Sequence, residues 1–82
     1  MITITYFGNL KDRLQTTQET MDWQGGTSDQ LLAILRKRGD EWAEALSEQN
    51  IFRVVVNEEI VFAAVEIHNG DRVALLPPVT GG

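Results

Sequence analysis

The strongest indication of chemistry in this 82-residue sequence lies in its last six residues, Pro77-Pro78-Val79-Thr80-Gly81-Gly82. No charged side chain follows Arg72, so the only charge expected on this segment is the main-chain carboxylate of Gly82. The two prolines cannot continue a strand ladder and favour an extended backbone, and six extended residues can reach about 20 Å. The two glycines present the carboxylate without side-chain bulk, which suits a narrow channel. Taken alone, this ending is equally compatible with a frayed terminus without function.

The rest of the chain offers few reactive side chains. The absence of cysteine excludes a disulfide, a cysteine zinc site, a thiol nucleophile and a persulfide on this chain. The single histidine, His68, is interpreted as a surface residue, because one imidazole cannot build a multi-histidine metal site. Glu58, Glu59 and Glu66 lack the spacing of metal ligands. We therefore expect no metal and no cofactor bound by this chain, and a carrier or adaptor before a free-standing enzyme.

Composition and charge narrow the class of partner. The chain is 43% hydrophobic, which is ordinary for one globular domain. Its 7 basic against 12 acidic residues give a net charge of −5, which argues against nucleic-acid binding and for a basic protein partner. No apolar run approaches the roughly 20 residues of a membrane helix, and no targeting segment is recognised. We expect a cytoplasmic protein that binds neither nucleic acid nor membrane.

Hydrophobic periodicity predicts the elements. Alternation predicts strands over 2–7, 16–23, 51–56, 60–62 and 72–76, the second pairing with the first. Short helical segments are expected over 10–14 and 41–47.

The main helix is predicted over 28–38. Thr27 and Gln30 have the spacing of a capping box at its start. Leu31, Ile34, Leu35 and Arg38 would share one face, and Gly39 would end the helix in a left-handed conformation.

The order of these elements predicts an α+β fold, a ubiquitin-like β-grasp in which one main helix packs on one face of a mixed sheet. The domain would span residues 1–76, and residues 77–82 would form an extended tail. Because side chains alternate along a strand, one of Leu75 and Leu76 should face the core and the other should face outward. The outward residue, together with Phe7 or Val79, would form an apolar docking patch.

Four segments of the chain carry a family resemblance. They are Tyr6-Phe7-Gly8-Asn9-Leu10-Lys11-Asp12, Trp42 with Ala45-Leu46 followed by Val56-Asn57, Asn69-Gly70-Asp71-Arg72-Val73-Ala74, and the ending 77–82. On these segments the chain resembles the ubiquitin-like sulfur carriers of the MoaD/ThiS family, most closely the small subunits of molybdopterin synthase. Two positions depart from that pattern, with Lys11 in place of the usual arginine and Leu75-Leu76 in place of phenylalanine.

The resemblance implies a non-catalytic sulfur-donor subunit in molybdenum cofactor biosynthesis. An E1-like adenylyltransferase would use ATP to adenylate the Gly82 carboxylate, and a desulfurase or rhodanese-type protein would supply sulfur for a thiocarboxylate. The large subunit of the synthase, in an expected heterotetramer, would then use that sulfur on cyclic pyranopterin monophosphate. Residues Pro77, Pro78, Val79, Thr80 and Gly81 would enter the partner's site, while Phe7, Leu75 and Leu76 would contact its surface.

Three alternatives remain open. A thiamine-type sulfur carrier shares the fold and the Gly-Gly ending. A ubiquitin-like modifier would share the activation step but form an isopeptide bond between Gly82 and a lysine. A plain interaction domain would have an inert tail.

Overall fold

In the computed structural model of the chain, residues 1–47 and 52–77 are described. The strands are β1 (Ile2–Tyr6), β2 (Gln18–Met21), β3 (Gly26–Thr27), β4 (Arg53–Val56), β5 (Glu59–Val61), β6 (Glu66–Ile67) and β7 (Arg72–Leu76). The helices are α1 (Gly8–Leu14), α2 (Ser28–Arg36) and α3 (Asp40–Ala45). The five predicted strands and three predicted helical segments are present within these ranges, although Ile51, the predicted start of β4, lies outside the described residues. The short strands β3 and β6 were not predicted.

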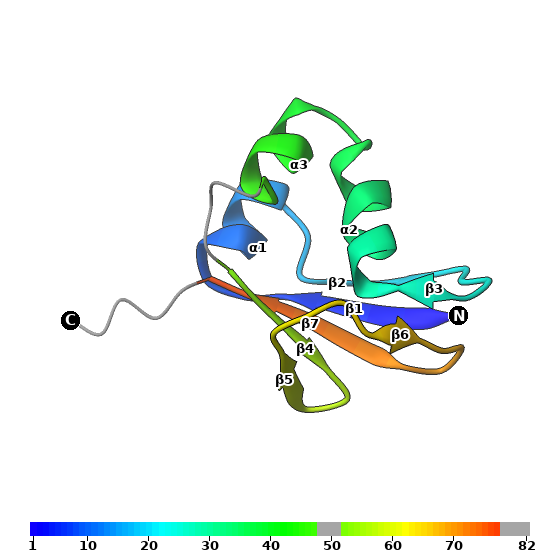
Figure 1. Ribbon diagram of the computed structural model, residues 1–82. Helices are drawn as coiled ribbons and strands as arrows, with labels where there is room; N and C mark the ends of the chain where they lie inside the picture. The colour runs from blue at the N-terminus through cyan, green and yellow to red at the C-terminus, as the bar shows by residue number, and fades with distance from the viewer. Residues whose placement is uncertain (48–51, 78–82) are drawn as a thin grey trace.

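The main sheet is mixed. Its five strands lie in the order β2-β1-β7-β4-β5, and β1 and β7 are the parallel pair at its centre. The other neighbours, including the predicted pair β1 and β2, are antiparallel. All three helices lie on one side of this sheet, while β3 and β6 form a separate two-stranded ribbon (Figure 1). This is the β-grasp arrangement, so the predicted fold class is confirmed.

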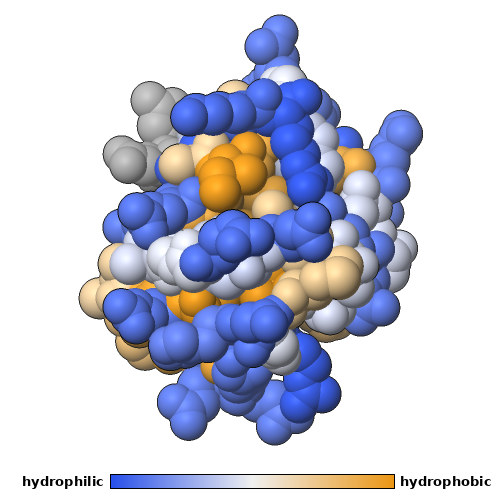
Figure 2. Space-filling model, turned by 90° about the vertical axis from the view of Figure 1, so that its right-hand side faces the viewer, coloured by the Kyte–Doolittle hydropathy of each residue, from blue (hydrophilic) through white to orange (hydrophobic). Residues whose placement is uncertain are grey.

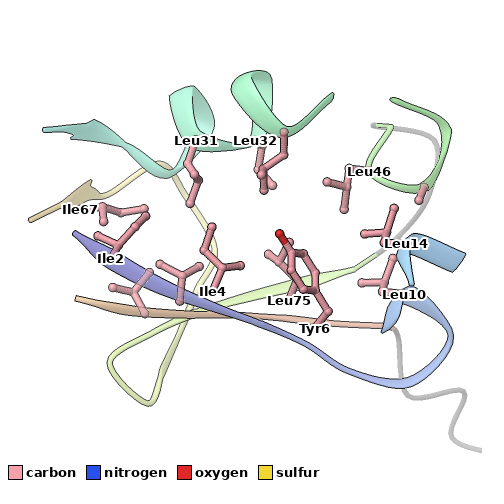
Figure 3. Close-up of a cluster of buried hydrophobic side chains, with 14 of the residues drawn as sticks. Ile2, Ile4, Tyr6, Leu10, Leu14, Leu31, Leu32, Leu46, Ile67 and Leu75 are labelled. Carbon is pink, nitrogen blue, oxygen red and sulfur yellow. The ribbon is translucent and has the colours of Figure 1, made fainter. Parts of the chain in front are cut away.

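The core lies between the sheet and the helices. Alternate side chains of β1 and β7 point toward α2, among them Ile4, Tyr6 and Leu75, each at most 1% exposed (Figure 3). From the other side, Leu31 and Leu35 of α2 are equally buried. Because each buried aliphatic side chain contributes about 1.5–3 kcal/mol relative to exposure, this layer supplies most of the cohesion of the domain.

The start of α2 is as predicted, but its buried face and its end differ. The Thr27 hydroxyl accepts from the Gln30 amide at 3.3 Å and the Gln30 side chain accepts from the Thr27 amide at 2.8 Å, which completes the capping box. Ile34, predicted to share a face with Leu31 and Leu35, is 45% exposed, and Leu32 is buried with those two leucines instead. The helix ends at Arg36, and Gly39 instead precedes α3 with φ 158° and ψ 176°. The predicted left-handed stop at Gly39 is therefore wrong.

Candidate functional site

The tail predicted to carry the chemistry follows a central strand of the sheet. Strand β7, which is hydrogen-bonded on both sides by β1 and β4, ends at Leu76, and Pro77 is the last residue described. Residues Pro78 to Gly82, to which the reactive terminus and most of the tail were assigned, lie outside the described residues. A strand held on both edges cannot shift its register without breaking two ladders. The root of the tail is therefore fixed to the most constrained part of the sheet.

The turn from β1 into α1 lies directly against this root (Figure 1). The Phe7 amide donates to the Leu75 carbonyl at 3.1 Å, which extends the β1–β7 pairing by one residue. Gly8 then takes φ +59°, and a Cβ added there would lie 2.5 Å from Cγ of Pro77. The backbone of Gly8 and the ring of Pro77 therefore touch closely, and a side chain at position 8 would displace the first residue of the tail.

The sheet face opposite the helices carries the predicted docking residues, with one correction. Phe7 is 44% exposed and Leu76 is half-buried, whereas Leu75 is 0% exposed in the core. The expectation that one leucine faces inward and the other outward is therefore confirmed. The assignment of Leu75 to a docking surface is wrong, because its side chain points toward α2.

The strand register adds residues that periodicity did not identify. Because Leu76 lies opposite Arg53 and Val54 lies opposite Val61, one row crosses the sheet from Phe7 through Leu76 and Arg53 to Phe62. The Arg53 guanidinium lies 5.9 Å from the centre of the Phe62 ring, and Phe62 is 84% exposed. We call this helix-free surface the open face. Its strand positions are Leu76, Arg53, Thr5, Ala74, Val55, Ile60, Thr3, Arg72, Gln18 and Thr20, and Phe7 and Phe62 directly follow β1 and β5.

A shallow hollow of about 180 Å³ lies on the open face. Its lining includes Thr5, Phe7, Val55, Ala74, Arg72 and Glu58. The hollow combines apolar side chains with one guanidinium and one carboxylate, a composition that fits a protein surface.

A partly buried polar network supports the same end of β1 from the helix side. The Tyr6 hydroxyl donates to Glu19 at 2.6 Å, and the Arg38 guanidinium donates to both oxygens of that carboxylate at 2.7 and 2.8 Å. Arg38 lies over the Trp42 ring at 4.7 Å, and Trp42 meets Tyr6 edge to face at 5.6 Å. The network connects strands β1 and β2 with helix α3 and with the segment between α2 and α3. It therefore holds Tyr6, the residue before Phe7, in place.

The charges of this network perturb its own titration. Burial, reinforced by the hydrogen bond to Glu19, raises the pKa of Tyr6 above its usual range. The hydrogen bonds from Arg38 lower the pKa of Glu19 despite the opposing effect of its partial burial. Both shifts favour a neutral phenol beside an ionised carboxylate. The group is therefore suited to fixing structure rather than to exchanging protons near neutral pH.

The remaining candidates from the sequence are the single histidine and a possible metal site. His68 is 72% exposed in the turn before β7, beside Glu66 at 3.3 Å and Asp71 at 3.9 Å. Within residues 1–47 and 52–77, no three His, Cys, Asp or Glu side chains are placed to hold a metal ion. No helix in the same ranges is long and apolar enough to cross a membrane.

Known proteins resemble this chain in both sequence and fold. The model of the ThiS family matches residues 4–82. Over the full length of both chains, the sequence is 27% identical to the molybdopterin synthase sulfur carrier subunit of Haemophilus influenzae and 29% identical to that of Escherichia coli K12. The crystal structure of SAMP1 from Haloferax volcanii superposes with a TM-score of 0.75 at 22% identity, covering 99% of this chain and 98% of the other. At that identity the last comparison supports the fold alone.

Proposed function

Because the chain belongs to the ThiS family, we propose that it is a sulfur carrier that acts through a thiocarboxylate on Gly82 and serves as the sulfur-donor subunit of a molybdopterin synthase. The observation that carries this proposal is the Gly-Gly ending, joined through Pro77 to the central strand of a β-grasp sheet. Two full-length relatives named as sulfur carrier subunits support it. The lack of cysteine fits as well, because sulfur on a terminal acyl group requires no thiol on this chain.

The proposed chemistry has three balanced steps. The Gly82 carboxylate attacks ATP on an E1-like adenylyltransferase, which forms the acyl-adenylate and releases pyrophosphate. The terminal sulfur of a cysteine persulfide on a desulfurase or rhodanese-type protein displaces AMP to give an acyl disulfide, and a second thiol of the partner proteins then cleaves the S–S bond, so that the carrier leaves as a thiocarboxylate and a partner disulfide remains. That sulfur attacks a carbon of cyclic pyranopterin monophosphate in the large subunit and displaces an oxygen substituent, and water then cleaves the acyl–sulfur bond, which leaves sulfur on the pterin and restores the carboxylate. Each pterin needs two sulfur atoms, so two loaded carriers are consumed per product.

The carrier itself contributes positioning. Residues Pro77 to Gly81 would extend into the partner's site, with Phe7 and Leu76 contacting the partner on the open face beside the root of the tail. Fixing a reactant relative to a partner's catalytic groups converts a bimolecular encounter into an effectively unimolecular step. In this proposal the acid, the base and the pterin pocket belong to the large subunit, ATP binds only to the activating enzyme, and the reaction takes place in the cytoplasm.

The test is the accurate mass of the C-terminal peptide. The full chain is incubated with its activating enzyme, ATP and a sulfur source, and the product is digested and fragmented. Exchange of one oxygen for sulfur must be localised to Gly82, because oxidation of Met1 or Met21 gives nearly the same mass change. A plain carboxylate at Gly82 after this treatment overturns the proposal.

A matched variant tests the role of the terminus. One residue added after Gly82 leaves residues 1–77 unchanged but moves the carboxylate, so we expect an unaltered fold and no sulfur loading. Loading that persists in this variant contradicts the mechanism.

Product identity separates the remaining alternatives. Loaded protein mixed with the pterin-handling large subunit should give molybdopterin. Transfer only to a thiazole-forming partner supports a thiamine-type carrier. A bond from Gly82 to a lysine supports a protein modifier.

A further inference from the structure

The open face differs in charge from the rest of the molecule. The chain as a whole has a net charge of −5. The strand positions of the open face include two arginines, Arg53 and Arg72, and no aspartate or glutamate. The carboxylate that borders this face is Glu58 in the β4–β5 turn, which lines the hollow with Arg72. The carboxylate of Glu19 is on the helix side of β2, because it lies opposite the buried Ile4. The overall acidity of the chain therefore does not describe the surface beside the tail.

Within the described part of the chain, the two open-face arginines are also the ones for which no guanidinium acceptor is found. Arg13 pairs with Glu41 at 2.9 Å, and Arg38 pairs with Glu19 at 2.7 Å. The guanidinium of Arg36 donates to the Leu46 carbonyl at 2.6 Å. Among residues 1–47 and 52–77, no carboxylate or carbonyl accepts from the side chain of Arg53 or Arg72, and both residues are exposed.

We propose that the open face docks the sulfur-accepting large subunit through an apolar patch on that partner flanked by carboxylates, which pair with Arg53 and Arg72. This inference rests on the proposed function and names the chemistry of the partner surface. It reverses the expectation from net charge, which pointed to a basic partner. Exposed aromatic and arginine side chains are the residues that most often dominate binding energy at interfaces, and Phe7, Arg53 and Phe62 stand in one row here.

Charge also selects among possible occupants of the open face. A second copy of this chain would bring two further arginines and no strand carboxylate to an isologous interface, and this excess of positive charge disfavours self-association. A nucleic acid needs a broader basic footprint than two guanidiniums on a chain of net charge −5. A carboxylate-bearing protein surface instead gives each guanidinium a bidentate partner.

Figure 2 shows the side of the molecule that is on the right in Figure 1, where β3, β6 and the N-terminus lie. Hydrophilic side chains predominate on this side, and hydrophobic ones show through only in separate areas. It therefore provides a surface on which control substitutions can be placed away from the root of the tail.

The experiment measures binding of the full chain to the large subunit of its own synthase by titration calorimetry at two salt concentrations. The variants are Arg53→Glu, Arg72→Glu and both together. The matched control is Lys37→Glu, which makes the same change of charge at an exposed position after α2. We expect each single reversal to weaken binding by about tenfold or more, the double variant to weaken it further, and the control to stay within about twofold. Binding of the wild-type chain should also weaken as salt rises.

The outcomes separate the two proposals. If the double variant binds as tightly as the wild-type chain, or more tightly, the inferred partner chemistry is wrong while the sulfur-carrier proposal stands. If the wild-type chain does not bind the large subunit at all, both fail. Circular dichroism should show the same fold for every variant, because none of the three side chains is buried.

Discussion

Replacing Gly8 by alanine tests whether the contact with Pro77 fixes the start of the tail. At φ +59° an alanine pays the penalty of the left-handed region, about 1–2 kcal/mol. The new Cβ would also lie 2.5 Å from Cγ of Pro77, well inside an ordinary contact distance. The proline ring cannot swing away as a flexible side chain would, because its atoms are tied to the backbone. Displacing it adds an overpacking cost of about 1–3 kcal/mol.

The two contributions can be separated by a double-mutant cycle. Pro77→Ala removes Cγ and Cδ and leaves Cβ, which is 3.8 Å from the added methyl group. In that background Gly8→Ala should cost only the backbone contribution, so the coupling between the two positions should be about 1–3 kcal/mol. Stability is measured by urea unfolding, with the fluorescence of Trp23 and Trp42 as the signal. Gly70→Ala is the control, since Gly70 has φ +94° and no atom within 4 Å of its added Cβ.

The same variants report on function. We expect Gly8→Ala to slow sulfur loading of Gly82 beyond any loss of folded protein, and Pro77→Ala to restore part of the rate, because the clash that redirects the tail is gone. A cost for Gly8→Ala that is equal in both backgrounds would refute the steric reasoning. A loading rate that follows only the folded fraction would refute its link to the tail.

Three further changes probe the supports of the site. Glu19→Gln should destabilise the fold by about 1–3 kcal/mol at neutral pH. Because the pKa of Glu19 is lowered in the fold, its contribution to stability is present above pH 4–5 and is lost as the pH falls through the folded pKa. The free energy of unfolding of the variant should therefore depend less on pH in acid than that of the wild-type chain. The raised pKa of Tyr6 makes stability depend on pH in the opposite direction. The free energy of unfolding should fall above about pH 10, and Tyr6→Phe should remove that loss. Glu58→Gly should stabilise the β4–β5 turn by about 0.5–1 kcal/mol in thermal unfolding, because Glu58 holds φ 73°. An unchanged or lower melting temperature for Glu58→Gly would contradict the turn assignment, and an unchanged acid profile for Glu19→Gln would contradict the pKa argument.

The local elements were predictable from the sequence because their causes are local. Alternation along β1 and β7 and the capping box at Thr27 depend on neighbouring residues only. The buried face of α2 was less predictable from the sequence. Its apolar residues form two overlapping stripes, made of Leu31, Leu32, Ile34 and Leu35. The side from which the sheet packs against the helix decides that Leu32 is covered and Ile34 is not. Periodicity alone carries no information about that approach.

The site was predictable in part, for a related reason. The alternation rule required Leu75 and Leu76 to face opposite sides, but which of them faced inward depended on where the helices lie. Arg53 and Phe62 were missed because their place in one row with Phe7 depends on the order of the strands, which the residue pattern alone does not give. A signal did exist: Ile60 and Phe62 alternate on one face of their strand.

The position of β7 between β1 and β4 has a consequence for biosynthesis. Strand β1 is translated first of the seven strands and β7 last, yet the two are paired at the centre of the sheet. Until β7 emerges from the ribosome, β1 can pair only with β2, β4 only with β5 and β3 only with β6, so the nascent chain holds separate strand pairs without the common five-stranded sheet. Joining them closes a loop that spans nearly the whole domain, which makes folding a late event that depends on non-local pairing. A prematurely terminated chain therefore has neither a completed sheet nor strand β7, which leads into the tail. Completion of translation becomes a precondition for activation of the Gly82 carboxylate.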